Sequence, residues 1–210
     1  MQLPKTFGLY AILTDPVKGY EYMIKLLVDL EVPFIQLRMK DTPLDEILAT
    51  AEKLRPITYG THSRFIINDH PAIAAKVNAD GVHLGQEDLS FSEARTIVGP
   101  DAIIGLSTHS PAQTIAACGL RPDYIGIGPV FPTPTKTKAD PAIGIEGMKT
   151  MIAAATVPHV AIGGIDLTNL RDVLAAGARN FCMVRQIMRA SDPQKVVCEI
   201  FEIYREFYTG

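Results

Sequence analysis

The sequence contains no tryptophan and only three cysteines, Cys118, Cys182 and Cys198. Three is an odd number, and their positions lack the close spacing that zinc sites require. Neither a disulfide framework nor a structural zinc site is therefore expected. Free thiols inside a hydrophobic core are typical of proteins in a reducing compartment. We expect three buried cysteines and a cytoplasmic location.

Long apolar segments and an excess of positive charge are also missing. No stretch approaches the roughly 20 apolar residues that cross a bilayer, and residues 1–15 lack the apolar core of a signal peptide. The formal net charge is −3, which argues against a basic surface for nucleic acid or lipid. We therefore expect neither a nucleic-acid partner nor a membrane partner. The oligomeric state stays open, and a homo-oligomer is compatible with the sequence.

Hydrophobic residues, by contrast, make up 47% of the 210 residues, which is enough for one large core. No linker or change in composition divides the chain, so we expect residues 1–210 to form a single domain. Short apolar segments alternate with amphipathic segments along its whole length. The apolar segments do not alternate with polar residues, which indicates strands that are covered on both faces.

This pattern predicts eight strand–helix units, each about 25 residues long. The expected strands are residues 7–13, 33–37, 64–67, 80–84, 102–106, 124–127, 159–162 and 180–184. The expected helices are residues 20–30, 42–54, 71–77, 90–98, 110–118, 145–155, 167–176 and 192–207. Thr42 is expected to cap the second helix, and Ser90 with Glu93 has the spacing of a capping box.

Eight such units predict an α/β protein with a (β/α)₈ TIM barrel. A doubly wound open sheet is the alternative, but that fold places its glycine-rich turn after the first strand. Here the pair Gly163-Gly164 follows the seventh expected strand. The barrel is therefore the better prediction.

In a TIM barrel the loops that follow the strands meet at one face, where active sites lie. Polar residues and glycines follow most of the expected strands. They are Gln36, Arg38, Lys40, Asn68, Asp69, Asp88, Ser107, His109, Thr133, Thr135, Lys136, Gly163, Gly164, Arg185 and Gln186. We expect the functional site among these residues.

Two of them, Asp69 and Asp88, follow adjacent strands and can approach the same ion. Two carboxylates with further oxygen ligands suit Mg²⁺, which leaves positions for phosphate oxygens. The alternative is that these residues cap helices, because Asp69 directly precedes one.

The cations Arg38, Lys40 and Lys136 are expected on the same face. With a metal ion they supply more positive charge than one phosphate needs, which favours a pyrophosphate. An ion pair at the barrel rim is the alternative for Arg38.

Residues 126–138 form a stiff loop, because three prolines between positions 129 and 134 exclude a helix or a central strand. Its two threonines, Thr133 and Thr135, and Lys136 suit an anionic ligand, although an ordinary surface turn is the alternative. Gly163-Gly164 and the backbone N–H groups after the eighth strand match a common barrel phosphate site, or else a plain tight turn. Two anion sites favour a transferase with two substrates.

Six stretches carry a resemblance to a known family: residues 36–41, 67–69, 81–88, 105–109, 126–136 and 161–165. In this order and at these gaps they resemble the thiamine-phosphate synthase (thiamine-phosphate pyrophosphorylase) family. That family joins 4-amino-2-methyl-5-hydroxymethylpyrimidine diphosphate to a thiazole phosphate, which is carboxylated in some cases, and releases pyrophosphate.

The resemblance implies a role for each matching residue. Binding of the pyrimidine diphosphate is implied for Gln36, Leu37, Arg38, Met39, Lys40, Asn68, Ser107 and Lys136. Binding of the thiazole phosphate is implied for Thr133, Pro134, Thr135, Gly164, Val184 and Arg185. The implied Mg²⁺ ligands are Asp69 and Asp88, and the implied catalytic residues are Arg38, Ser107 and Lys136. The implied mechanism is dissociative, with stabilisation of the departing pyrophosphate.

The sequence departs from the family after the eighth strand, where Val184-Arg185-Gln186 replaces a Val-Ser-Ala type of stretch. Backbone N–H groups do not depend on the side chain, so phosphate binding is compatible with this change. Whether the Arg185 side chain contacts the phosphate stays open. Two alternative functions also remain. A thiazole tautomerase of the same superfamily would not need the metal and cation set, and a non-catalytic thiamine-phosphate-binding regulator would bind without turnover.

Overall fold

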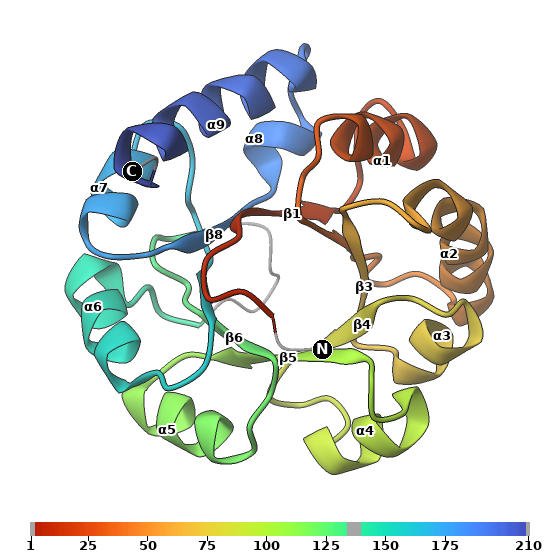
Figure 1. The fold of residues 1–210 in the computed structure, drawn as a ribbon, viewed down its shortest axis with the longest axis horizontal. Coiled ribbons are helices and arrows are strands. Elements are labelled where there is room, and N and C mark those ends of the chain that lie inside the picture. Colours follow the sequence, from red (N-terminus) through yellow and green to blue (C-terminus); the bar gives the residue numbers. More distant parts are fainter. Residues whose placement is uncertain (1–2, 134–139, 209–210) are drawn as a thin grey trace.

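The computed structural model describes residues 3–133 and 140–208. Eight parallel strands, each paired with the next along the chain, form a barrel that closes where β8 pairs with β1 (Figure 1). The strands are β1 (Gly8–Leu13), β2 (Phe34–Leu37), β3 (Arg64–Asn68), β4 (Gly81–Leu84), β5 (Ile103–Thr108), β6 (Tyr124–Ile127), β7 (His159–Ala161) and β8 (Asn180–Met183). The predicted (β/α)₈ TIM barrel is confirmed.

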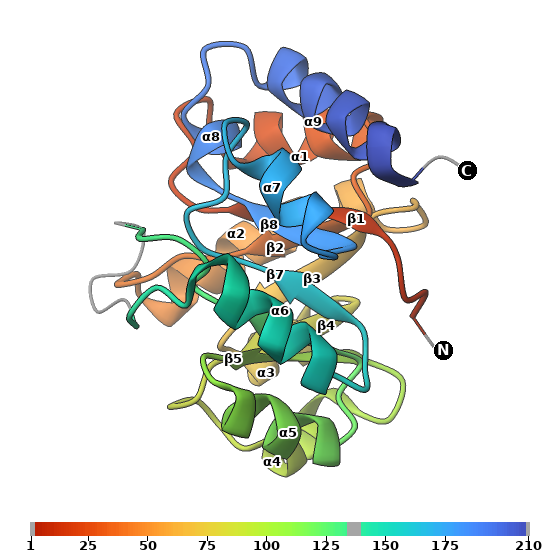
Figure 2. The ribbon, with the colours of Figure 1, turned by 90° about the vertical axis from the view of Figure 1, so that its left-hand side faces the viewer.

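Helices form an outer ring around this barrel (Figure 1). They are α1 (Tyr20–Asp29), α2 (Leu44–Thr58), α3 (Pro71–Lys76), α4 (Phe91–Val98), α5 (Pro111–Gly119), α6 (Gly144–Ala154), α7 (Leu170–Ala175), α8 (Arg185–Met188) and α9 (Pro193–Tyr208). In the side view, the chain ends lie on one side and the described part of the loop after β6 lies on the other (Figure 2). The loops that follow the strands thus share one face.

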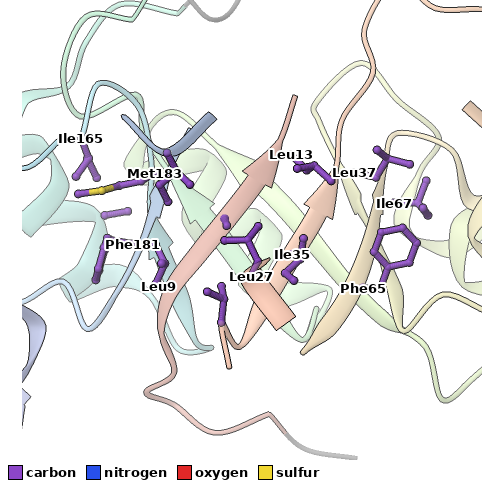
Figure 3. Packing of buried hydrophobic residues seen from close by; sticks show 14 of the residues in the cluster. Leu9, Leu13, Leu27, Ile35, Leu37, Phe65, Ile67, Ile165, Phe181 and Met183 are labelled. Carbon is purple, nitrogen blue, oxygen red and sulfur yellow. The ribbon is translucent and has the colours of Figure 1, made fainter. Parts of the chain in front are cut away.

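Two apolar layers follow from the alternation of side chains along each strand. On β2, Ile35 and Leu37 point outward into the core between barrel and helices, and Figure 3 shows part of this outer layer. Phe34 belongs instead to a smaller cluster inside the barrel. That inner cluster contains Leu3, Tyr10, Ile12, Phe34, Ile66, Ile103, Tyr124, Val160 and Cys182.

The helix caps agree with the sequence at α4 and differ at α2. Ser90 and Glu93 form the predicted capping box. Thr42 does not cap α2, because Pro43 occupies the N-cap position and the Thr42 hydroxyl donates to the Lys40 carbonyl at 3.1 Å. That helix also continues to Thr58, beyond its predicted end, and contains Pro56 in its last turn.

Two further expectations were wrong. The helix α8 was not expected, since four residues are too few to show a helical period. Cys198 is exposed, whereas Cys118 and Cys182 are buried as predicted. Cys198 lies on α9 beside the buried stripe of Val197 and Ile200, so its side chain faces solvent.

Within the part of the chain that the structure describes, no helix has the length and apolar character needed to span a bilayer. The cytoplasmic location, the single domain over residues 1–210, the lack of nucleic-acid or membrane partners and the oligomeric state stay predictions.

Asn180, fully buried at the start of β8, joins three segments at the point where the barrel closes. Its Oδ1 accepts hydrogen bonds from the backbone N–H groups of Phe7 at 2.6 Å and Gly8 at 3.0 Å. Its Nδ2 donates to the carbonyls of Lys5 at 3.0 Å and His159 at 2.9 Å. One side chain therefore holds the N-terminal segment and β7 against β8.

We expect Asn180→Ala to lower the free energy of unfolding by about 2–4 kcal/mol, because it leaves buried backbone groups without partners. Urea unfolding followed by circular dichroism measures this change. The control is Gln194→Ala on the exposed surface of α9, which should change stability by less than about 0.5 kcal/mol. Equal stability of the two variants would contradict the role of Asn180.

Candidate functional site

The face at which the strands end contains two adjoining hollows. One, of about 810 Å³, reaches into the barrel as far as Tyr10, Gln36 and Tyr124. The other, of about 1710 Å³, lies over the loops that carry Lys40 and Asp88. Residues that line both hollows are Arg38, Asn68, His83, Ser107, His109, Val184, Arg185 and Arg189. The two hollows therefore form one continuous cavity.

Most of the residues singled out from the sequence line this cavity. They are Gln36, Arg38, Lys40, Asn68, Asp69, Asp88, Ser107, Thr133, Gly164, Val184 and Arg185. The Leu37 side chain lies instead in the outer core, because β2 turns its even-numbered residues into the barrel. Met39 lines neither hollow and packs against the outer core. Pro134, Thr135 and Lys136 lie outside the described residues.

The floor of the inner hollow is polar, although it lies inside the barrel. Gln36 Nε2 donates to Tyr10 Oη at 2.9 Å, and the Tyr10 and Tyr124 hydroxyl oxygens are 2.8 Å apart. Burial raises the pKa of both tyrosines, so both hydroxyls stay protonated. Gln36 Oε1 is buried and has no hydrogen-bond partner within residues 3–133 and 140–208. A buried acceptor without a partner is costly, which favours a ligand that donates to it.

The hydrogen-bonded chain continues from the floor toward the mouth. His83 Nδ1 lies 3.0 Å from Tyr124 Oη, and His83 Nε2 lies 2.9 Å from Ser107 Oγ. Ser107 in turn lines both hollows. An unbroken set of contacts thus connects Gln36, deep in the barrel, to the hydroxyl of Ser107 at the junction of the hollows.

Gly105 on β5 makes room for the middle of this chain. A Cβ atom at position 105 would lie 2.1 Å from Cζ of Tyr124 and 2.5 Å from its hydroxyl oxygen. Both atoms belong to a fully buried ring that cannot move aside. A side chain at this position would therefore displace Tyr124 from its two hydrogen bonds.

The two carboxyl groups of Asp69 and Asp88 meet in the outer hollow and form a hydrogen bond. Asp69 also forms an ion pair with Lys40, and Asp88 accepts a hydrogen bond from the Gly85 N–H at 2.6 Å. Asp69 is not a helix cap, because His70 occupies the N-cap position of α3. Asp69 has φ +62°, an uncommon conformation that its loop holds with a 2.8 Å bond from its N–H to the His83 carbonyl.

The electrostatic environment shifts the pKa values of Asp69 and Asp88 in opposite directions. Burial favours a higher pKa for Asp69, but hydrogen bonds from Lys40 and Asp88 outweigh it and lower that pKa. Burial and the adjacent Asp69 raise the pKa of Asp88. Within residues 3–133 and 140–208, no group of three or more His, Cys, Asp and Glu side chains is placed to hold a metal. A cation here would therefore take two carboxylates and complete its shell with other oxygens, as Mg²⁺ commonly does.

Arg38 provides positive charge at the junction of the hollows. Burial lowers its pKa, and the charges of Asp69, Asp15 and Asp41 oppose that shift. Arginine stays protonated in proteins, so the guanidinium remains a cation. It forms no ion pair with any residue that the structure describes, which leaves its donors available to an anion.

The glycine pair after β7 supports the loop after β6. The N–H of Val130 donates to the Ile162 carbonyl at 2.8 Å, and that of Phe131 donates to the Gly163 carbonyl at 2.9 Å. Gly163 has φ +99°, and a Cβ there would lie 2.4 Å from Cβ of Pro129. Gly164 has φ +64°, and its Cβ would lie 2.6 Å from Cβ of Phe131. Glycine is required at both positions because the two loops stack, and this stacking positions Thr133 at the inner hollow.

Sequence reasoning did not identify Tyr10, His83, Tyr124 or Arg189 as site residues. The two tyrosines lie inside apolar strands, where nothing in the sequence marks the inward face as polar. One signal was present: His83 is the only ionisable residue within the strand Gly81–Leu84. Arg189 was missed because the helix that presents it was missed.

A family model described as "Thiamine monophosphate synthase" matches residues 9–187 of this chain. A thiamine-phosphate synthase of Caldicellulosiruptor bescii is 40% identical over 210 residues, which cover 99% of this chain and 96% of that protein. One of Gloeobacter violaceus is 40% identical over 191 residues, or 91% of this chain, which spans only 56% of that longer protein.

Among solved structures, a thiamine phosphate pyrophosphorylase from Pyrococcus furiosus superimposes with a TM-score of 0.86 at 33% identity. The superposition covers 96% of this chain and 97% of the other. Sequence and structure thus agree over nearly the whole length. The chain belongs to the thiamine monophosphate synthase family, whose members are enzymes of the transferase class.

Proposed function

We propose that this enzyme condenses 4-amino-2-methyl-5-hydroxymethylpyrimidine diphosphate with a thiazole phosphate to give thiamine phosphate and pyrophosphate. The observation that supports this proposal best is the continuous cavity. It joins a buried polar floor to a mouth that carries a carboxylate pair and an arginine that has no ion-pair partner in the described part of the chain. A reaction that joins two ring compounds, each carrying an anionic group, needs a polar ring pocket and anion-binding groups side by side.

The inner hollow suits the pyrimidine. An aminopyrimidine can donate from its amino group to Gln36 Oε1, the buried acceptor that has no partner among the described residues. Its diphosphate would then extend to Arg38, Asn68 and Ser107 at the junction of the hollows and to Lys40 in the outer hollow. Lys136, outside the described residues, remains an expected ligand of the same group. The reverse orientation of this substrate would place its diphosphate among buried aromatic rings, and the cost of desolvating the charged group disfavours it.

Asp69 and Asp88 are the residues that would hold Mg²⁺. The oxygen-only donor set fits this ion, and the ion would neutralise charge on the leaving pyrophosphate. Lys40, which pairs with Asp69, would then be released to the phosphate oxygens. The two aspartates would thus hold the metal ion, while Lys40 would bind the diphosphate.

The other side of the cavity suits the thiazole phosphate. Thr133, Gly164, Val184 and Arg185 line the inner hollow and lie on the three loops after β6, β7 and β8. Their hydroxyl, backbone N–H and guanidinium groups are anion donors. Pro134 and Thr135, outside the described residues, are expected to complete this side.

The proposed reaction breaks the bond between the pyrimidine methylene carbon and the diphosphate oxygen, and the electron pair leaves with pyrophosphate. The electron-rich aminopyrimidine tolerates the resulting cation, and the thiazole nitrogen lone pair then forms the new C–N bond. No enzyme group becomes covalently attached. Arg38 and Ser107 donate to the departing oxygens, while the two sides of the cavity hold carbon and nitrogen in line.

The proposal predicts the reaction itself. Purified protein incubated with the pyrimidine diphosphate, thiazole phosphate and Mg²⁺ should form thiamine phosphate and pyrophosphate in equal amounts, measured by liquid chromatography and a pyrophosphate assay. Conversion of a thiazole carboxylate tautomer without use of the diphosphate would indicate a tautomerase. Tight binding of thiamine phosphate without turnover would indicate a regulator.

The raised pKa of Asp88 predicts how metal-free stability depends on pH. A carboxyl group whose pKa is raised by folding favours the folded state less once pH exceeds that pKa. In EDTA, Asp88→Asn should therefore match the wild type near pH 4. Toward pH 7 it should become more stable by less than about 1 kcal/mol, because water screens this half-buried group. Thermal unfolding from pH 4 to pH 8 measures the difference.

Addition of Mg²⁺ should reverse that order. Mg²⁺ with inorganic pyrophosphate should raise the melting temperature of the wild type and leave that of Asp88→Asn nearly unchanged. Asp101→Asn, at an exposed turn before β5, is the matched control and should respond like the wild type. An equal rise in wild type and Asp88→Asn would remove Asp88 from the metal site.

Arg185→Gln tests whether this arginine contacts the thiazole phosphate. We expect KM for the thiazole phosphate to rise about tenfold with little change in kcat, since a charge-assisted hydrogen bond made equally in ground and transition states is lost. Steady-state kinetics with each substrate varied in turn gives both constants. An unchanged KM would assign this phosphate to backbone N–H groups alone.

A further inference from the structure

The side chains of Gln36, Tyr10, Tyr124, His83 and Ser107 form a single file of hydrogen bonds, and each hydroxyl in the file has only one proton to donate. Gln36 Nε2 donates to Tyr10 Oη, so the Tyr10 proton is available for Tyr124 Oη, 2.8 Å away. Tyr124, having accepted this bond, directs its own proton toward His83 Nδ1 at 3.0 Å. The first bond therefore favours one direction for the next two.

The same assignment of donors and acceptors extends to the imidazole of His83. A neutral histidine whose Nδ1 accepts carries its proton on Nε2. That nitrogen lies 2.9 Å from Ser107 Oγ, so it donates to the serine. The Ser107 hydroxyl proton then remains for an acceptor in the cavity, where Ser107 lines both hollows.

Rotation of the Gln36 amide by half a turn would reverse every bond. Oε1 would accept from Tyr10, each later group would accept from its neighbour, and Ser107 would give its proton to His83. Its lone pairs would then face the diphosphate, which repels them. The end of the Gln36 amide that the ligand occupies thus decides whether Ser107 donates to that ligand.

We propose that Tyr10, Tyr124 and His83 are positioning residues that make Ser107 a donor to the leaving diphosphate, in a state selected when the pyrimidine amino group docks on Gln36 Oε1. This inference rests on the proposed function and adds a specificity device to it. A diphosphate whose organic part offers no donor to Gln36 would not select the donor state of Ser107. The diphosphate of a plain alkyl alcohol is such a compound.

A double-mutant cycle tests whether Tyr124 acts through Ser107. Ser107→Ala should lower kcat about 100-fold, the scale of one lost oxyanion donor. Tyr124→Phe should lower kcat about tenfold and change KM for the pyrimidine diphosphate less than about threefold. In the Ser107→Ala background the same change should alter kcat less than about twofold, since coupled residues are non-additive. A tenfold loss in both backgrounds would overturn the proposal.

Tyr204→Phe is the matched control, because it removes a hydroxyl that donates to the Arg179 carbonyl at 3.0 Å, on the outer helix α9. It should cost some thermal stability and leave kcat unchanged. If Tyr124→Phe does not fold, Tyr10→Phe breaks the preceding bond in the file and should show the same non-additivity with Ser107→Ala.

The tautomer of His83 gives a readout that needs no turnover. With ¹⁵N-labelled histidine and His83→Gln for assignment, the wild type bound to the pyrimidine diphosphate, with no thiazole phosphate present, should show an unprotonated Nδ1 and a protonated Nε2. Tyr124→Phe should populate both tautomers. A protonated Nδ1 in the wild type would overturn the proposed direction of the chain. If the expected tautomer is found but the product assay fails, the result would count against the proposed function and not against the proposed direction of these hydrogen bonds.

Discussion

Closure of the sheet between β8 and β1 is the constraint on which the rest of the structure depends. Asn180 holds the N-terminal segment and β7 at that seam through four hydrogen bonds. Once eight parallel strands form a closed ring, all the loops that follow them share one face. Residues as distant in sequence as Arg38, Asp88 and Arg185 thereby surround one cavity. The site is a consequence of the topology more than of any single loop.

The interior of the barrel contains an apolar cluster and a series of hydrogen-bonded polar side chains. Aromatic rings and aliphatic side chains fill the inner cluster, yet the hydroxyls of Tyr10 and Tyr124 stay paired within it. Gly105 makes this possible by leaving the space that the Tyr124 ring occupies. Buried polar groups are tolerated when each is satisfied. Gln36 Oε1 is the exception among these groups. It is also the atom to which the amino group of the proposed pyrimidine substrate would donate.

The sequence was sufficient to predict the barrel, because each strand is a short apolar segment that lies between recognisable amphipathic helices. It also placed Asp69, Asp88 and Arg38 at the face where the cavity lies, since charged residues shortly after apolar strands are easy to recognise. It did not distinguish the two faces of a strand that is apolar on both, so Leu37 was expected in the site and Tyr10 was not. The helix α8 was too short to show a period, and Arg189 was missed with it. Contacts between loops, such as the stacking of Gly163 on Pro129, depend on the closed barrel and have no local signal.

The central claim is that two anionic substrates meet in one cavity, with the carboxylate pair on one side and the glycine pair on the other. A crystal structure with Mg²⁺, pyrophosphate and the thiazole phosphate tests it most directly. We predict Mg²⁺ on Asp69 and Asp88, pyrophosphate on Arg38 and Ser107, and the second phosphate beside Gly164 and Arg185. Both phosphate groups on the same side of the cavity, or a metal ion away from both aspartates, would contradict this account.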